Sequence, residues 1–288
     1  MRILVTGKNG QVGYELMRSL QPLGEVIGVD RQEMDLSDLD QVRDVIRRVQ
    51  PSLIVNPAAY TAVDKAESEP ELAMRINGLA PGVMAEEAAK LGAAIVHYST
   101  DYVFDGTKPE PYNEVDLPCP LNVYGRTKLA GEQAIAAAGV PYLIFRTSWV
   151  YGMRGKNFLL TMMRLAAERD ELRIVADQHG APTWCRTLAD TTACILAQAK
   201  SAGDNGAWWR ENSGLYHLTS QGETTWHGFA DALLDQAEKK PKLVPISSIE
   251  YPVPAARPNN SRLSCELLMK KFGHLPHWRE VLRLCQEA

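Results

Sequence analysis

The sequence contains few cysteines, and no two of them stand close together in the sequence. Five cysteines are scattered between Cys119 and Cys285 in a chain of 288 residues, without a CxxC motif. The disulfide frameworks of small secreted domains and the common zinc sites need cysteines at short, regular spacing. The pattern therefore excludes both kinds of protein and is typical of a reducing compartment.

Long apolar runs and basic runs are also missing. No stretch approaches 18 consecutive apolar residues, and the apolar segment after Met1 is too short for the core of a signal peptide. Lysine and arginine total 31 against 35 aspartate and glutamate, which gives a formal charge of -4 and a pI near 5.9. Nucleic-acid surfaces are usually basic. We expect a cytoplasmic protein that binds small molecules, with neither nucleic acid nor membrane as a partner.

The chain begins with a glycine-rich turn. Arg2 to Thr6 is an apolar, β-rich run, and Gly7, Gly10 and Gly13 follow it before a segment with helical spacing. A backbone that turns sharply off a parallel strand can aim its N–H groups and a helix N-terminus at a diphosphate. A second apolar run ends at Asp30, about 20 residues past the turn, where a carboxylate would accept hydrogen bonds from a ribose. These features predict a dinucleotide-binding unit.

Strands and helices alternate along the rest of the chain. Apolar strands are expected at 51–55, 93–99, 140–147, 173–175, 215–219 and 242–246, and helices at 71–91, 121–139, 157–168, 187–199 and 225–237. This alternation predicts an α/β fold, a Rossmann-type doubly wound parallel sheet with a smaller, discontinuous C-terminal substrate lobe. Residues 1–150 would form the NAD(P)-binding Rossmann domain, to which segments near 187–220 return. Residues 151–288 would mainly form the substrate-binding lobe.

Two local expectations can be checked directly. Ser37 is the expected N-cap of a helix that carries Leu39, Val42 and Ile46 on one face. Residues 201–214 are rich in turn-forming types and are expected to be a surface loop.

Tyr124 and Lys128 stand four residues apart, so they share one face of a helix. A phenol can donate a proton to a forming alkoxide, and a nearby ammonium favours the phenolate that results. A solvated Tyr/Lys face is the commoner meaning of this spacing in an arbitrary helix. The glycine turn upstream, and a strand that ends in Ser99, Thr100 and Asp101, favour the catalytic interpretation.

Five segments of the sequence together carry a family resemblance. They are TGKNGQVG at 6–13, NPAAYTAVDKAE at 56–67, HYSTDYVFDG at 97–106, PLNVYGRTKLAGE at 120–132 and FRTSWVYG at 145–152. From residue 1 to roughly residue 190, the chain resembles the extended short-chain dehydrogenase/reductases, and among them the dTDP-4-dehydrorhamnose reductases.

The resemblance implies that NAD(P)H reduces the 4-keto group of dTDP-4-dehydro-β-L-rhamnose to give dTDP-L-rhamnose, the final step of dTDP-rhamnose biosynthesis. Hydride would pass from the nicotinamide to C4, and Tyr124 would supply the proton. Thr100 would polarise the ketone. Lys128 would orient the cofactor ribose and lower the pKa of Tyr124.

Binding residues are implied at matching positions. The cofactor would be lined by Gly7, Gly10, Gln11, Val12, Gly13, Asp30, Asp35, Leu36, Ala59, Tyr60, Thr61, Tyr98, Tyr124 and Lys128. The sugar nucleotide would contact Thr100, Asp101, Tyr124, Trp149 and Arg257, the last through its diphosphate. Asp30 would repel a 2′-phosphate and favours NADH, whereas Arg31 could pair with that phosphate and favours NADPH. We therefore expect both cofactors to be used.

Some reductases of this family are described with Mg²⁺ at a dimer contact, and Glu15 matches one such position. Arg186 stands where a second acidic residue would be expected. Its positive charge works against a divalent cation. We expect metal-bridged pairing to be weak or absent, and the chain to be a monomer or a weak homodimer.

Two other functions stay open at this point. A nucleotide-sugar epimerase of the same fold would recycle its nicotinamide, so net consumption of NAD(P)H separates it from a reductase. A non-catalytic, NADP-binding regulatory subunit of the same fold would bind without turnover. The presence of Thr100, Tyr124 and Lys128 argues against the regulatory subunit.

Overall fold

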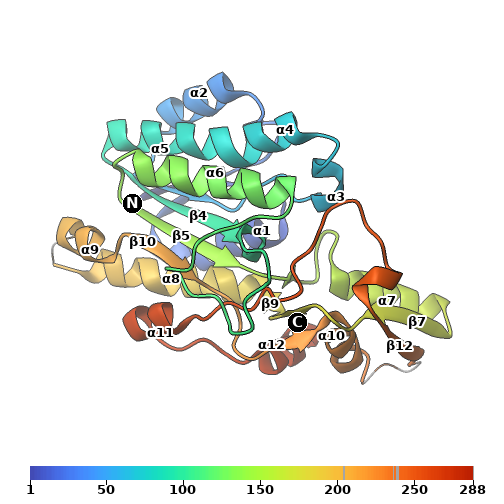
Figure 1. Ribbon diagram of the computed structural model, residues 1–288. Coiled ribbons are helices and arrows are strands. Elements are labelled where there is room, and N and C mark those ends of the chain that lie inside the picture. Colours follow the sequence, from blue (N-terminus) through green and yellow to red (C-terminus); the bar gives the residue numbers. More distant parts are fainter. Residues whose placement is uncertain (204, 236, 238–239, 288) are drawn as a thin grey trace.

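A six-stranded parallel sheet forms the centre of the computed structural model, which describes residues 1–203, 205–235, 237 and 240–287 (Figure 1). The strand order is β10-β5-β4-β3-β1-β2, and all neighbouring pairs are parallel. The strands are β1 (Arg2–Thr6), β2 (Glu25–Val29), β3 (Leu53–Asn56), β4 (Ala94–Thr100), β5 (Tyr142–Thr147) and β10 (Gly214–His217). The order reverses beside β1, as in a doubly wound sheet. The predicted fold class is confirmed.

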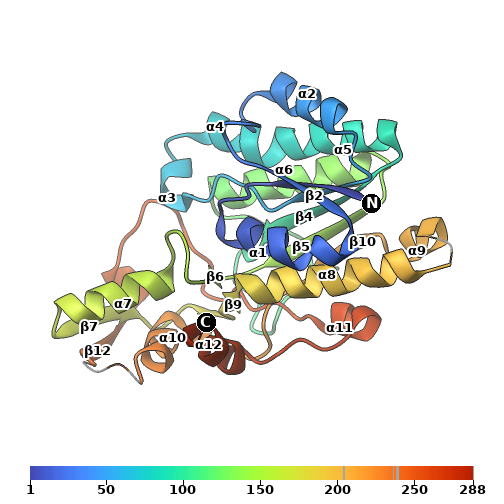
Figure 2. The same cartoon turned by 180° about the vertical axis from the view of Figure 1, so that it is seen from behind.

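Helices cover both faces of the sheet, as Figures 1 and 2 show from opposite sides. One face carries α2 (Leu39–Val49), α4 (Pro70–Met74), α5 (Ala80–Leu91) and α6 (Val123–Ala137), and the other carries α1 (Gln11–Ser19) and α8 (Cys185–Ser201). Side chains alternate between these layers along each strand. Leu4 packs in the core under α2 and α5, whereas Ile3 and Val5 pack in the core against α1 and α8.

A smaller lobe lies beside the sheet and is built from separate parts of the chain (Figure 1). Its longer elements are α7 (Phe158–Glu168), β7 (Glu171–Val175), α10 (Trp226–Leu233), β12 (Lys242–Ile246) and α12 (Trp278–Gln286). The strands β7 and β12 pair in parallel, although about 70 residues of sequence separate them. Tyr151, Phe229 and Trp278 fill its core. Between the lobe's segments the chain returns to the sheet through α8 and β10, and the domain boundary at residue 150 stays a prediction.

Short elements complete the fold. They are β6 (Val150–Tyr151), β8 (His179–Gly180), β9 (Thr183–Trp184), β11 (Thr224–Thr225), α3 (Val63–Ala66), α9 (Asn205–Asn212), α11 (Glu266–Phe272), the 3₁₀ turns η1 (Gln21–Leu23), η3 (Asp101–Val103) and η4 (Ser248–Glu250), and the π-helical turn η2 (Arg75–Leu79). Within the described parts of the chain, every helix is too short or too polar to cross a bilayer.

Two local predictions were wrong, and one was right with a local irregularity. Asp38, not Ser37, caps α2 by accepting from the N–H groups of Asp40 and Gln41, while the hydroxyl of Ser37 donates to Asp35. The helix expected at 71–91 is present as one continuous helical run of α4, η2 and α5, and its π-helical turn η2 stands just before Pro81, which has no N–H to donate. The loop expected at 201–214 contains α9, which buries Trp209 against the sheet core.

A buried ion pair fastens α6 to the sheet. Arg146 of β5 donates from Nε and Nη2 to the two carboxylate oxygens of Glu132, at 2.9 and 2.6 Å, and both side chains are 4% exposed. Such parallel hydrogen bonds fix orientation as well as distance. The pair therefore sets the position of the helix that carries Tyr124 and Lys128.

Replacing Glu132 by alanine should lower the free energy of unfolding by about 3–5 kcal/mol, because Arg146 would keep a buried charge without its partner. The matched control is Glu168→Ala, since Glu168 pairs with Arg164 at the surface and both side chains are more than 50% exposed. The control should lose less than about 1 kcal/mol. Urea unfolding measures both variants, and similar small losses would show that the buried pair does not hold α6 in place.

Candidate active site

The site begins where the strand order reverses, between β1 and β3. The loops after these two strands face each other: Gly7 has φ +58°, and a Cβ built on it would lie 3.0 Å from the Cβ of Ala58. A Cβ on Gly13 would lie 2.1 Å from the carbonyl oxygen of Gly7, so α1 can pack this closely on the turn only with glycine there. Ligands of open parallel sheets bind at such a reversal.

A pocket of about 320 Å³ opens beside this turn. Its lining includes the predicted cofactor residues Gly7, Asp30, Asp35, Leu36, Ala59, Tyr60 and Thr61. The predicted residues Gly10 to Gly13 form the turn itself and the start of α1, where Gln11 Oε1 accepts a hydrogen bond from Asn157 at 2.8 Å. Many of the predicted cofactor residues are therefore brought together around this pocket and the turn, and their contact with a dinucleotide stays a prediction.

Charged side chains of both signs lie at the edge of this pocket that Asp30 and Asp35 form. Asp30 Oδ2 accepts from Asn9 at 2.9 Å and lies 3.9 Å from Lys8 Nζ. Arg31 donates from Nε to Asp35 at 3.2 Å, and its side chain is 77% exposed. Its guanidinium therefore has donors free to face an anion in the pocket.

The side chain of Tyr98 does not lie with the other predicted cofactor residues. Its hydroxyl forms a hydrogen bond with Thr192 of α8 at 2.6 Å, and its ring packs against Phe145. Alternation along β4 turns Tyr98 to the face that α8 covers. Its backbone carbonyl faces the other way and accepts from Lys128 at 2.6 Å, and contact of Tyr98 with the cofactor stays a prediction.

Thr100, Asp101 and Tyr124 meet at the carboxyl end of β4. The Thr100 hydroxyl donates to Asp101 Oδ1 at 3.0 Å and accepts from the Tyr102 N–H at 3.1 Å. The ring of Tyr102 stands edge-on to Tyr124, with centroids 5.9 Å apart. Burial raises the pKa of Asp101 to about 7, against the hydrogen bond from Thr100.

The start of α6 is held tightly against this strand end. Asn122 caps the helix by accepting from the Gly125 N–H, and a Cβ on Gly125 would lie 2.1 Å from the Tyr102 carbonyl oxygen. Burial raises the pKa of Tyr124, and the nearby Asp101 carboxyl adds to this rise. The expected lowering of this pKa by Lys128 is thus not seen here, because the lysine donates to β4 instead. Tyr124 is a protonated phenol, ready to act as an acid.

Two polar residues near the site went unnoticed in the sequence. Asn77 of η2 accepts from the Tyr60 N–H at 2.8 Å and donates to the Tyr60 carbonyl at 3.1 Å, which fixes the loop that lines the small pocket. His97 contacts Lys128 from β4 at 3.1 Å. Both could have been found in the sequence as polar residues within an otherwise apolar helix or strand. Such a residue needs a hydrogen-bond partner when it is buried.

Trp149 occupies a strained position between two neighbours. Its φ is +46°, a region uncommon for bulky side chains and associated with functional sites. Its ring stacks on Trp226 with centroids 3.7 Å apart, and a Cβ on Gly180 would strike it at 2.5 Å. Trp149 thus lies at the junction of the two lobes, and its contact with a sugar stays a prediction.

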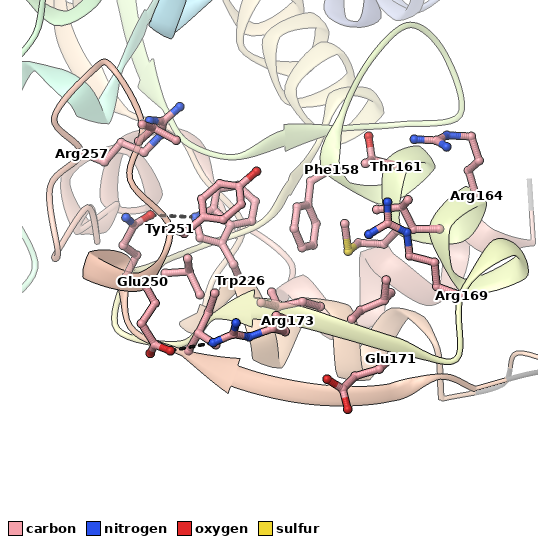
Figure 3. Close-up of a pocket in the computed structure, with 18 residues that line it drawn as sticks. Phe158, Thr161, Arg164, Arg169, Glu171, Arg173, Trp226, Glu250, Tyr251 and Arg257 are labelled. Atoms are coloured by element: carbon pink, nitrogen blue, oxygen red, sulfur yellow. Dashed lines mark hydrogen bonds and ion pairs between the residues drawn. The ribbon is translucent and has the colours of Figure 1, made fainter.

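Arg257 ties the smaller lobe to the sheet. Its Nη1 and Nη2 donate to the two carboxylate oxygens of Asp64 at 3.0 and 2.9 Å. It also borders a pocket of about 840 Å³ in the smaller lobe (Figure 3). The aromatic rings of Trp226, Phe158 and Tyr251 lie in the middle of that view, with Arg257 at one end and Arg164 and Arg169 at the other. Arginines around aromatic rings suit a base and a diphosphate.

The position considered for Mg²⁺ does not fit a cation. Arg186 donates from Nε to Glu15 at 3.2 Å, so a guanidinium already neutralises this carboxylate. The described residues also bring together no cluster of three or more His, Cys, Asp and Glu side chains that could hold a metal.

Comparison with known proteins places this geometry in a family. Residues 1–288 match the family described as RmlD substrate binding domain. The dTDP-4-dehydrorhamnose reductase of Burkholderia thailandensis is 52% identical over 294 residues, which cover 99% of this chain and 98% of that protein.

Two solved structures with similar names superpose over nearly the whole chain. A dTDP-4-dehydrorhamnose reductase of Clostridium acetobutylicum has a TM-score of 0.92 at 37% identity and covers 100% of this chain and 99% of its own. One from Bacillus anthracis, solved in complex with NADP, has a TM-score of 0.89 at 36% identity and covers 99% and 98%. The chain therefore belongs to the dTDP-4-dehydrorhamnose reductase family of NAD(P)H-dependent oxidoreductases.

Proposed function

We propose that this chain reduces the 4-keto group of dTDP-4-dehydro-β-L-rhamnose with NADPH or NADH and so forms dTDP-L-rhamnose, the last step of dTDP-rhamnose biosynthesis. The observation that carries the proposal is that Tyr124 lies against Thr100 at the carboxyl end of β4, while Lys128, one turn along α6, donates to the Tyr98 carbonyl of the same strand. The names of the relatives support the substrate, and the NADP complex of the Bacillus anthracis protein supports the cofactor.

The cofactor would lie along the glycine turn and the 320 Å³ pocket, with its nicotinamide toward Tyr124. When bound, it supplies the hydride that reduces C4. The protein's part is to place donors where negative charge develops on the ketone oxygen. The hydroxyl of Thr100 would turn from Asp101 to donate to that oxygen.

Tyr124 would deliver the proton. Because burial keeps its phenol protonated, it enters the reaction as an acid and leaves it as a phenolate. The ammonium of Lys128, which donates to the Tyr98 carbonyl, would hold the cofactor ribose with its remaining N–H. A proton from solvent then restores the phenol, so each cycle consumes one NAD(P)H and one proton.

The 840 Å³ pocket would receive the nucleotide part of the substrate. Trp226 and Phe158 offer faces for the thymine ring, and Trp226 is fixed by its hydrogen bond to Gln178 at 3.2 Å. Arg257 lies between this pocket and Asp64, where a diphosphate could share its donors. Trp149 would then border the sugar, next to Thr100 and Asp101.

Replacing Tyr124 by phenylalanine should lower kcat by about 100- to 10,000-fold, because the proton donor is removed while the ring remains. Loss of NADPH or NADH absorbance with dTDP-4-dehydro-β-L-rhamnose measures the rate. Tyr151→Phe is the matched control, since the Tyr151 hydroxyl has no hydrogen-bond partner among the described residues, and it should keep its activity. A kcat of Tyr124→Phe within a few-fold of the wild-type value would refute the assigned role. Wild type that binds cofactor but shows no net oxidation would favour the epimerase or the regulatory subunit.

Replacing Arg31 by alanine should lower the ratio of kcat/KM for NADPH to that for NADH by about 10-fold, since a charge-assisted hydrogen bond to the 2′-phosphate is lost. The control is Arg43→Ala, which removes an arginine paired with Asp40 on α2 and should leave the ratio unchanged. An unchanged ratio in Arg31→Ala would mean that Arg31 does not read the phosphate.

A further inference from the structure

A row of buried polar side chains crosses the sheet from the glycine turn to Lys128. Thr6 and Asn56 are the last residues of β1 and β3, His97 lies in the middle of β4, and Asn56 pairs with His97 in register. The distances are 2.6 Å from Thr6 Oγ1 to Asn56 Oδ1, 3.0 Å from Asn56 Nδ2 to His97 Nδ1, and 3.1 Å from His97 Nε2 to Lys128 Nζ. All four residues are at most 1% exposed. The lysine is therefore joined to the cofactor side of the sheet by continuous hydrogen bonding.

Lys128 is buried without a carboxylate of its own. Among the described residues, its ammonium has two acceptors, the Tyr98 carbonyl at 2.6 Å and His97 Nε2 at 3.1 Å. The carboxylate of Glu132, one turn along α6, is already bound by Arg146. A buried cation needs hydrogen-bond acceptors to stay charged. His97 Nε2 is thus one of the two acceptors that bind the ammonium.

The charge on Lys128 dictates the tautomer of His97. An ammonium can only donate, so Nε2 must accept and the ring proton must be on Nδ1. Asn56 then turns its amide oxygen to Nδ1–H and its NH₂ to Thr6, an orientation related by an amide flip to the one described above. Burial holds the pKa of His97 well below its ordinary value, and the charge of Lys128 adds to this, so the ring stays neutral.

We propose that His97 is a positioning residue for catalysis: its Nδ1-protonated ring, oriented by Asn56, holds the Lys128 ammonium on the Tyr98 carbonyl and leaves one N–H for the cofactor ribose. The inference rests on the proposed reductase function. Because His97 is fully buried and contacts Asn56 and Lys128, its removal would act through the lysine.

The rate should depend on pH through Lys128. Burial lowers its pKa to about 8, and the carboxylate of Glu132 opposes this. The charged form predominates below that pH, so the reductase rate falls as the pH rises through it. The charged group that acts on Lys128 is Glu132 of α6, which Arg146 of β5 binds, and the charged group that acts on His97 is Lys128 itself. They are the same in all the variants compared below.

Two amide variants separate the contact with the lysine from mere loss of a histidine. The amide of His97→Gln reaches the position of Nε2 and can accept from Lys128, whereas that of His97→Asn reaches only the position of Nδ1. His97→Asn should lower kcat by about 10-fold and move the alkaline limb of the pH–kcat profile about one unit to lower pH, because the charged lysine loses an acceptor. His97→Gln should keep the limb of the wild type. Equal limbs in wild type and His97→Asn would overturn the proposal.

The wild-type protein offers a second test that needs no turnover. Long-range ¹H–¹⁵N spectra of the histidine rings report which nitrogen is protonated, and the signals absent from His97→Gln identify His97. We expect a neutral ring with the proton on Nδ1 from about pH 6 to 7.5, with no titration in that range. A ring protonated on Nε2, or one that titrates normally, would overturn the proposal. If wild type shows no reductase activity, the proposed function fails, and the tautomer is still decided by the spectra.

Discussion

Burial of the Lys128 ammonium is the constraint on which the rest of the site depends. A charge that is 1% exposed can remain only if acceptors are placed against it. The Tyr98 carbonyl and His97 provide them from β4, and so α6 must lie at one height and one rotation over that strand. The height and the rotation of α6 are fixed by the ion pair of Glu132 with Arg146 and by the close contact of Gly125 with the Tyr102 carbonyl. The segment YGRTKLAGE thus carries the lysine and also the residues that hold it in place.

Hydrogen bonds also join the two lobes. Asp64 follows β3 in sequence and binds Arg257 of the C-terminal part with two hydrogen bonds. Asn122, which caps α6, also donates to the Ala256 carbonyl at 2.8 Å. The helix that bears Tyr124 is therefore tied to the segment that borders the larger pocket. These contacts set the position of Tyr124 relative to that pocket.

Much of the fold could be predicted, because its signals are local. The apolar run before Gly7, the three glycines and the carboxylate at Asp30 lie within thirty residues, and each follows from what a parallel strand and a diphosphate require. An irregularity before Pro81 was also readable in principle, since proline has no N–H to donate within a helix. Helix α9 was not, because its stability comes from burying Trp209 against a core assembled elsewhere in the chain.

Within the site, contacts between residues that are far apart in the sequence could not be predicted from it. Alternation along β4 could have separated His97 from Tyr98, yet only the fold shows that His97 faces α6 and that Tyr98 faces α8. The stacking of Trp149 on Trp226 and the pairing of Arg257 with Asp64 likewise join residues 77 and 193 positions apart. The chemistry that the spacing of Tyr124 and Lys128 suggests stays a prediction, and packing decides where each side chain points.

The fate of the hydride tests the central claim most directly. NADPH and NADH carrying deuterium on one or the other face of the nicotinamide C4 would be incubated with dTDP-4-dehydro-β-L-rhamnose, and the products analysed by mass spectrometry and NMR. The account predicts that one of the two labelled faces delivers one deuterium to C4 of the sugar for each cofactor oxidised. A product without deuterium at C4, or an isomerised sugar beside unchanged cofactor, would contradict it.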